Sequence, residues 1–197
     1  MRPTATAFLA AASLLGTACS PPPAGPSASQ DRPFRSGTVL TERLSDAAFQ
    51  GNRKAVEDML PTVDVNATDE GGRTMLMLAS YGGHSTTVRL LCENKADPNR
   101  RDANRRTALM YAASGPNARS VEILLAHGAQ VNVTDGEEGW TALMFASAEG
   151  HADIVGMLLD RGADPGLMDI DGESALTFAL NNGHNEVAAM LRGAQRR

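Results

Sequence analysis

Four histidines are the first residues whose chemistry suggests metal binding or proton transfer. Three of them, His84, His151 and His184, each follow a glycine. They are separated by 67 and 33 residues, so the first interval is about twice the second. A metal ion needs ligands that converge in one tight shell, whereas residues that recur once per repeat are kept apart by the repeat itself. We therefore interpret these three as structural residues at helix starts. His127 precedes Gly128 at a predicted helix end, where a partly positive side chain suits the helix dipole.

The other residues that could carry chemistry do not combine into a catalytic set. Cys92 lies on a predicted helix, and the equivalent positions of the later sequence repeats, which are described below, hold Ala126 and Asp160. We therefore interpret Cys92 as an inert thiol. No Ser-His-Asp set, no pair of carboxylates in a pocket and no phosphate-binding glycine loop can be read from the chain. We therefore predict no catalytic residue, no metal site, no cofactor and no enzyme activity.

The composition of the chain excludes several classes of protein. The chain has 197 residues and a formal net charge of −5, which argues against a dedicated nucleic-acid-binding protein. Aromatic residues make up only 4%, which disfavours a β-sandwich or barrel and favours helices packed through small side chains. Two cysteines, Cys19 and Cys92, are too few for a disulfide scaffold.

The first 18 residues have the features of a secretory signal peptide. Arg2 precedes an uncharged stretch rich in Ala and Leu, and small residues follow at positions 16–18. The run from Leu14 to Cys19 resembles a bacterial lipobox, which implies that Cys19 is the lipid-attachment residue; cleavage after Ala18 by ordinary signal peptidase stays open. With Ser20 after the cysteine, the resemblance implies an outer-membrane lipoprotein facing the periplasm, or else a soluble periplasmic protein.

A short spacer follows the predicted signal peptide. Residues 19–37 are rich in Pro, Ser and Ala and hold few large apolar residues, so they cannot bury enough surface to fold. We expect this segment to be a disordered tether. Any contact with a membrane would then be through the lipid on Cys19.

The rest of the chain repeats with a period of about 33 residues. Thr74, Thr107, Thr141 and Ser174 recur at this period, and the sequence from Thr107 to Ala113 closely matches that from Thr141 to Ser147. Pairs of large apolar residues recur at one place in the period and predict a continuous hydrophobic seam between stacked units: Leu90-Leu91, Leu124-Leu125, Leu158-Leu159 and Met190-Leu191.

This pattern resembles the ankyrin repeat, which is a β-turn finger followed by two antiparallel helices. The resemblance covers residues 38–193 and implies an all-α repeat solenoid of about five helix-turn-helix units. We place the units at residues 38–66, 67–99, 100–132, 133–166 and 167–193, with the first and last as polar caps and residues 194–197 as a basic tail. Lys95 stands where later units have Gly128 and Gly162, so we expect a left-handed residue that costs about 1 kcal/mol.

The fingers differ in charge, and the resemblance places them on a concave binding surface together with the first helices. The finger from Asn99 to Arg106 has a net charge of +3, and each of the next two fingers has −3. Two interpretations remain open: a charge-patterned docking site that sets partner choice, or a simple surface bridge from Arg105 or Arg106 to Glu137 or Glu138 of the next finger.

Trp140 is the single residue that we most expect to contact a partner. It directly precedes the helix cap Thr141, at a position that we call the slot and that other units fill with Arg73, Arg106 and Glu173. These polar residues suggest that the slot faces water. An exposed Trp beside charges is a typical interface anchor; the alternative is packing along the finger onto Arg106. Near the ends of the first helices we expect further contact residues, which are Phe49, Tyr81, Ser114 and Glu149. On the fingers we expect four more contact residues, which are Arg73, Arg105, Arg106 and Glu173.

Two functions follow from these expectations. The first is a non-catalytic protein-binding module in the bacterial cell envelope, with no nucleic-acid partner. The second is an inhibitor or immunity protein that neutralises an exported toxin enzyme, or an accessory factor in periplasmic peroxide defence, which the resemblance to exported bacterial ankyrin proteins implies.

Overall fold

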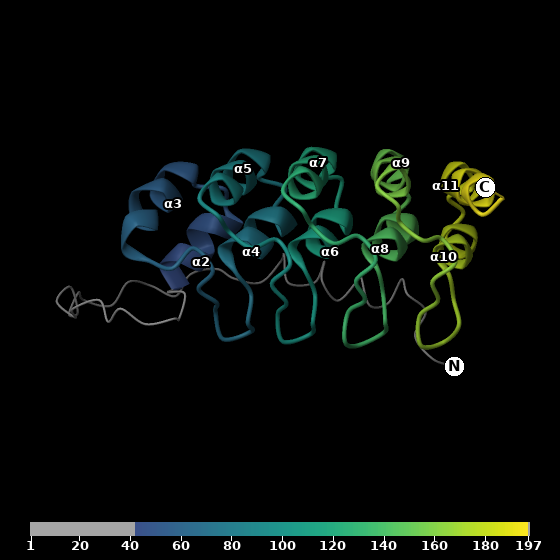
Figure 1. The fold of residues 1–197 in the computed structure, drawn as a ribbon, viewed down its shortest axis with the longest axis horizontal. Helices are drawn as coiled ribbons and strands as arrows, with labels where there is room; N and C mark the ends of the chain where they lie inside the picture. The colour runs from purple at the N-terminus through teal and green to yellow at the C-terminus, as the bar shows by residue number, and fades with distance from the viewer. Residues whose placement is uncertain (1–41, 197) are drawn as a thin grey trace, which may run out of the picture. The chain divides into compact units, whose positions relative to one another are not determined.

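A computed structural model describes residues 42–196, and the predicted signal peptide, Cys19 and the tether lie outside this range. Within it the chain forms an all-α solenoid of five helix pairs with no strands (Figure 1). The first helices of the pairs are α2 (Glu42–Phe49), α4 (Met75–Tyr81), α6 (Ala108–Ala113), α8 (Ala142–Glu149) and α10 (Ala175–Asn181). The second helices are α3 (Arg53–Met59), α5 (Ser85–Glu93), α7 (Ala118–Ala126), α9 (Ala152–Asp160) and α11 (Asn185–Ala194), and a short 3₁₀ turn, η2 (Leu60–Thr62), follows α3.

The helices form two layers, and the hairpin fingers project from one side. Figure 1 shows the second helices in one row, the first helices in a row beneath them, and the fingers below the first helices. We call the surface made by the fingers and the first helices the finger–helix face. No helix in the described range is long and apolar enough to cross a membrane.

The first helices begin where a hydroxyl can satisfy free backbone N–H groups. The side chains of Thr74, Thr141 and Ser174 each accept a hydrogen bond from the backbone N–H three residues later, at 3.3 Å in all three cases. Thr107 occupies the same position without a side-chain cap. The repeated hydroxyl residue of the sequence therefore marks the start of four first helices.

The hydrophobic seam contains one fully buried residue from each predicted pair. Leu91, Leu124, Leu158 and Leu191 have no exposed surface, and they recur once per unit. Their neighbours Leu159 and Met190 are only partly buried. The predicted seam is confirmed. The fully buried residue is the second member of the pair at Leu91 and Leu191, and the first member at Leu124 and Leu158.

The turn after the second helix requires a left-handed residue in three units. Lys95 has φ 67°, and Gly128 and Gly162 at the equivalent positions have φ 85° and 81°. The expected left-handed lysine is therefore confirmed. A second non-glycine residue, Arg105, has φ 59° at a finger position that other units fill with glycine, which the sequence analysis did not anticipate.

Candidate protein-binding face

One aspartate holds each finger in shape. The four residues Asp69, Asp102, Asp135 and Asp169 recur once per unit, and each accepts at least two backbone hydrogen bonds from its own finger at 2.8–3.1 Å. Asx turns of this kind replace missing backbone partners with a side-chain acceptor. These carboxylates are therefore structural parts of the fingers. This structural role was not predicted from the sequence, although their recurrence once per unit could have identified it.

The finger tips are joined into one surface by main-chain hydrogen bonds. Ala103 N donates to Gly71 O at 3.0 Å, Gly136 N to Asn104 O at 2.8 Å, and Ile170 N to Glu138 O at 3.0 Å. Each bond connects a finger to its predecessor at an equivalent position. The four fingers therefore present a continuous edge and not four independent loops.

Arg106 links the third unit's finger to the fourth. Its Nε lies 3.3 Å from Asp135 Oδ2 and its Nη2 lies 2.7 Å from Glu137 Oε2, while the guanidinium also stands over the Phe145 ring at 5.6 Å. The Arg106 side chain is only 17% exposed and that of Asp135 only 1%. The predicted bridge from Arg106 to Glu137 is thus confirmed. Arg106 also pairs with the buried Asp135, so removing Arg106 would leave a buried carboxylate without this partner.

Trp140 is buried, so the expectation that its slot faces water is wrong. Its exposed fraction is 8%. Its ring packs against Phe145 of its own unit at a centroid distance of 5.0 Å and against Phe178 of the next unit at 4.4 Å. Its backbone N–H donates to Asp135 Oδ1 at 3.0 Å. Trp140 therefore lies in the interface between two repeats, where a partner protein cannot reach most of its ring.

Aromatic residues on the first helices form a row that is open to solvent. Phe49 on α2 and Tyr81 on α4 are 38% and 42% exposed, and their rings stack at 6.0 Å. Tyr81 in turn meets the half-buried ring of Tyr111 on α6 edge-on at 5.8 Å. We call Phe49, Tyr81 and Tyr111 the aromatic row. Tyr111, which the sequence analysis did not select, is held by a 2.6 Å hydrogen bond from its hydroxyl to Asp102 Oδ2, and burial together with this bond raises its pKa.

The other predicted contact residues on the fingers make contacts of their own. Arg73 is exposed but pairs with Asp69 of its own finger at 2.8 Å, and Arg105 is exposed at the finger turn. Glu173 is half-buried and accepts a hydrogen bond from Asn181 Nδ2 at 3.4 Å. None of these three side chains joins the aromatic row.

The predicted contact residues near the ends of α6 and α8 do not extend the row either. Ser114 fills the position of Phe49 and Tyr81 in the third unit, and it is half-buried. Glu149 falls one residue after that position in the fourth unit, where the equivalent residue is the buried Ala148. The aromatic row therefore ends at the third unit.

Two of the three repeated histidines connect their unit to the one before it. His84 Nε2 lies 2.8 Å from Phe49 O, and His184 Nε2 lies 3.0 Å from Ala148 O. His151 is the equivalent residue of the fourth unit, and its buried Nε2 has no hydrogen-bond partner among the described residues. In the described range no three His, Cys, Asp or Glu side chains cluster as metal ligands would.

Cys92 is buried on α5, and desolvation raises the pKa of its thiol to about 11. A thiol with such a pKa is almost fully protonated at neutral pH and is a poor nucleophile.

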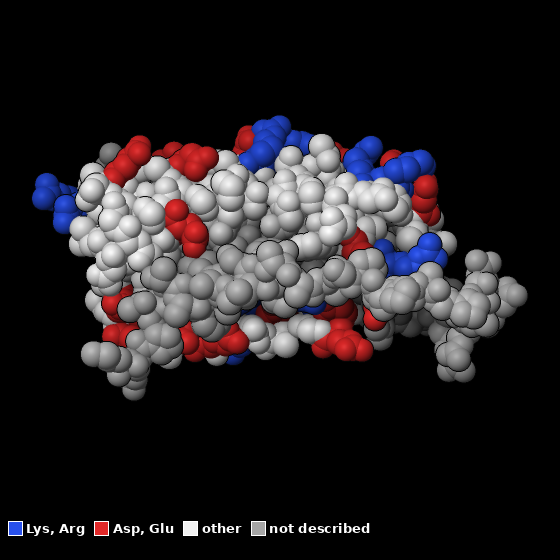
Figure 2. All heavy atoms as spheres, turned by 180° about the vertical axis from the view of Figure 1, so that it is seen from behind, with Lys and Arg blue, Asp and Glu red and all other residues white. Residues whose placement is uncertain are grey.

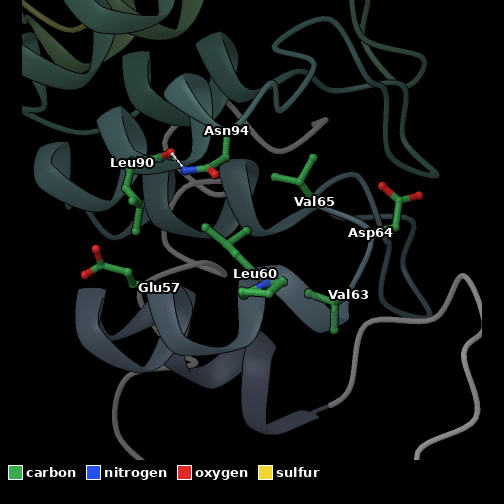
Figure 3. Close-up of a pocket in the computed structure, with 8 residues that line it drawn as sticks. Glu57, Leu60, Val63, Asp64, Val65, Leu90 and Asn94 are labelled. Carbon is green, nitrogen blue, oxygen red and sulfur yellow. Dashed lines mark hydrogen bonds between the residues drawn. The ribbon is translucent and has the colours of Figure 1, made fainter.

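A shallow pocket lies on the opposite layer from the fingers. It has a volume of about 500 Å³ and lies where α3 and η2 meet α5. Figure 3 shows the side chains of Leu60, Val63 and Val65 between Glu57 on one side and Asp64 on the other. The two carboxylates are held apart and form no acid–base pair.

Comparison with known proteins agrees with the architecture. The family model for ankyrin repeats (3 copies) matches residues 44–135 and 121–195, which together span most of the chain. A search of curated proteins finds no match. Ankyrin repeats generally mediate protein–protein interaction, and the family is typically non-catalytic. With its five stacked helix pairs, linked fingers and the matched repeats, the chain belongs to the ankyrin-repeat family.

Proposed function

We propose that this protein is a non-catalytic interaction module that binds a protein partner through its finger–helix face. The observation that carries the proposal is the aromatic row, in which Phe49 and Tyr81 stack on each other and remain more than one third exposed. Large apolar side chains that stay exposed beside one another are typical of interaction surfaces.

The geometry of the row suits a binding anchor. Its rings come from three consecutive first helices, so their spacing is set by the packing of the units and not by flexible loops. Tyr presents a large ring with few rotatable bonds and is enriched among the residues that dominate binding energy. Beside the row, the linked fingers add a charged border that can select among partners.

A capture experiment tests this function. The full chain with a carboxyl-terminal affinity tag would be used as bait in cells that naturally make it, beside the variant Phe49→Ser/Tyr81→Ser. A matched control is Arg89→Ser/Glu93→Ser, which changes two exposed residues of α5 on the opposite layer. Circular dichroism would establish that all three baits are folded.

The proposal predicts a protein that the wild type and the control capture and that the aromatic variant loses. Capture of the same proteins by all three baits, or loss with the control alone, would contradict it.

We also propose that the module acts in the bacterial cell envelope, attached through a lipid on Cys19. This proposal is supported by the uncharged, signal-like stretch before Cys19 and the Pro-rich spacer after it. Metabolic labelling with an alkyne fatty acid tests it: the wild type should carry the label and Cys19→Ser should not. An unlabelled wild type that starts at Cys19 would show ordinary cleavage after Ala18.

A further inference from the structure

The last finger exposes two large apolar side chains near its tip. Met168 and Ile170 are 65% and 69% exposed, the highest values among the exposed large hydrophobic residues in the described range. At the position of Met168 the earlier fingers have Thr68, Arg101 and Thr134, and at that of Ile170 they have Glu70, Ala103 and Gly136. Polar or small residues therefore suffice for the finger fold, and folding alone does not require Met168 and Ile170.

These side chains belong to a surface shared by two fingers. Ile170 N donates to Glu138 O, and Ile170 Cγ2 would lie 3.6 Å from a Cβ built on Gly139. The side chain of Ile170 therefore lies beside the backbone of the preceding finger. We call Met168, Ile170 and the two fingers that carry or flank them, residues 133–140 and 167–173, the acidic–apolar tip.

The charge of this tip is strongly negative. The two fingers contain six carboxylates and no cation of their own: Asp135, Glu137, Glu138, Asp169, Asp171 and Glu173. Arg106 from the preceding finger pairs with Asp135 and Glu137, Arg101 donates to Thr134 O, and Arg105 lies beside Gly136. Six carboxylates against these three cations leave a net negative charge on the tip. Figure 2 shows Asp and Glu side chains gathered along the lower edge of the molecule, which is the finger edge.

From this combination we infer that the acidic–apolar tip docks a cationic amphipathic segment of the partner, in which apolar side chains are flanked by Lys or Arg. The inference rests on the proposed function and specifies the chemistry of the partner. Apolar contact with Met168 and Ile170 supplies buried area, and the carboxylates attract and orient cationic groups while they repel anionic surfaces such as nucleic acid or phospholipid headgroups. The occupant is therefore a basic protein segment.

The probe for this inference is a fluorescent synthetic helical peptide with one Leu face and one Lys face. Its affinity for the full chain would be measured by fluorescence anisotropy at two salt concentrations. An all-Lys peptide of equal charge and a Leu/Glu peptide of equal apolar area separate the electrostatic contribution from the apolar one.

Two variants remove one property of the tip each. Met168→Ser/Ile170→Ser deletes the apolar contacts, and Glu138→Gln/Glu173→Gln removes two charges while keeping side-chain shape. The matched control Glu93→Gln/Glu186→Gln makes the same change of net charge at exposed residues of α5 and α11.

We expect each tip variant to weaken binding of the Leu/Lys peptide about tenfold, which corresponds to the loss of roughly one partly buried side chain or charge pair. The control should change the affinity less than twofold. The apolar variant should leave all-Lys binding unchanged, and the wild type should bind the Leu/Glu peptide far more weakly than the Leu/Lys peptide.

The inference is overturned if the wild type fails to bind the Leu/Lys peptide, or if the control weakens binding as much as the tip variants do. It is also overturned if the apolar variant binds as tightly as the wild type. These results leave the proposed function standing wherever Phe49→Ser/Tyr81→Ser still loses the captured partner, so the two failures are distinguishable.

Discussion

Arg73, Arg106, Trp140 and Glu173 occupy the same slot of four consecutive units, yet they have different surroundings. The Arg73 side chain is 48% exposed and pairs within its own finger, whereas Trp140 is enclosed. The difference comes from the residues four positions after each helix cap: Trp140 has Phe145 in its own unit and Phe178 in the next, both within ring-packing distance. An aromatic slot residue is buried where aromatic neighbours flank it on both sides.

Trp140→Ala is expected to destabilise the fold by about 3–5 kcal/mol, because it leaves a cavity between Phe145 and Phe178. Urea unfolding followed by circular dichroism would measure the loss, and Trp140→Phe, which keeps a ring in the slot, should lose clearly less. A free energy of unfolding within a few tenths of a kcal/mol of the wild type for Trp140→Ala would mean that the slot is open to water after all.

The lowered pKa of His151 predicts that the folded protein loses stability in mild acid. Burial lowers its pKa below the ordinary 6.5, in spite of the raising effect of Glu149 and Asp153, and nearby His184 lowers it further. The unfolded chain therefore binds a proton at a pH at which the folded chain does not, so this contribution to stability falls as the pH drops below about 6.5. His151→Asn copies Asn117, the equivalent residue of the third unit.

Unfolding of the wild type and His151→Asn between pH 7.5 and pH 5 would test this effect. We expect the wild type to lose more stability than the variant over this range. Parallel pH curves would show that His151 titrates normally in the folded protein.

The turns between helices carry strain at particular positions. Lys95 adopts a left-handed conformation that Gly128 and Gly162 adopt without a side-chain penalty. A Cβ built on Gly162 would meet nothing within 4 Å, so the cost at this turn is conformational and not steric crowding by neighbours.

Lys95→Gly is therefore expected to stabilise the protein by up to about 1 kcal/mol, and the reverse change Gly162→Ala to destabilise it by a similar amount. Thermal unfolding of both variants would measure the two shifts. If Lys95→Gly lowered the melting temperature, the lysine side chain would have to make a favourable contact that outweighs the strain.

The helix layers could be predicted from the sequence because their determinants recur. A hydroxyl cap, a buried leucine and a left-handed turn return in successive units, and the hydrogen bonds of Thr74 and Ser174 and the burial of Leu124 follow from that pattern. The sequence does not determine which residue of each apolar pair is fully buried, because two adjacent apolar residues fit the period equally well and only packing selects one.

The face could be predicted less completely, because its residues depend on contacts between units. Phe49 and Tyr81 are exposed near the ends of their helices, as expected. The burial of Trp140 depends on Phe178, which belongs to the next unit, and Tyr111 joins the row through its bond to Asp102. Such contacts depend on how closely neighbouring repeats stack, and the sequence of a single unit does not give this distance.

At the scale of the whole molecule, each unit packs mainly on its neighbours, so stability is distributed along the stack. The middle units bury helices on both sides: among the second helices, five of the nine residues are buried in α5 and in α7, whereas only Val56 of α3 and three of the ten residues of α11 are. The ends of the stack should therefore open before its centre.

Native-state hydrogen exchange followed by mass spectrometry should show this gradient. We expect slower exchange in α5 and α7 than in α3 and α11, because local opening costs less where fewer apolar contacts are lost. Uniform protection from α3 to α11 would indicate one fully cooperative unit in place of a stack of coupled repeats.

The central claim is that partners bind the finger–helix face, and site-specific photocrosslinking tests it most directly. A photoreactive phenylalanine analogue would replace Tyr81 in the aromatic row, or Arg89 on the exposed side of α5, in cells that make the protein. The account predicts a crosslinked protein at position 81 and none at position 89. A crosslink at position 89 with none at position 81 would place the binding surface on the opposite layer and contradict the account.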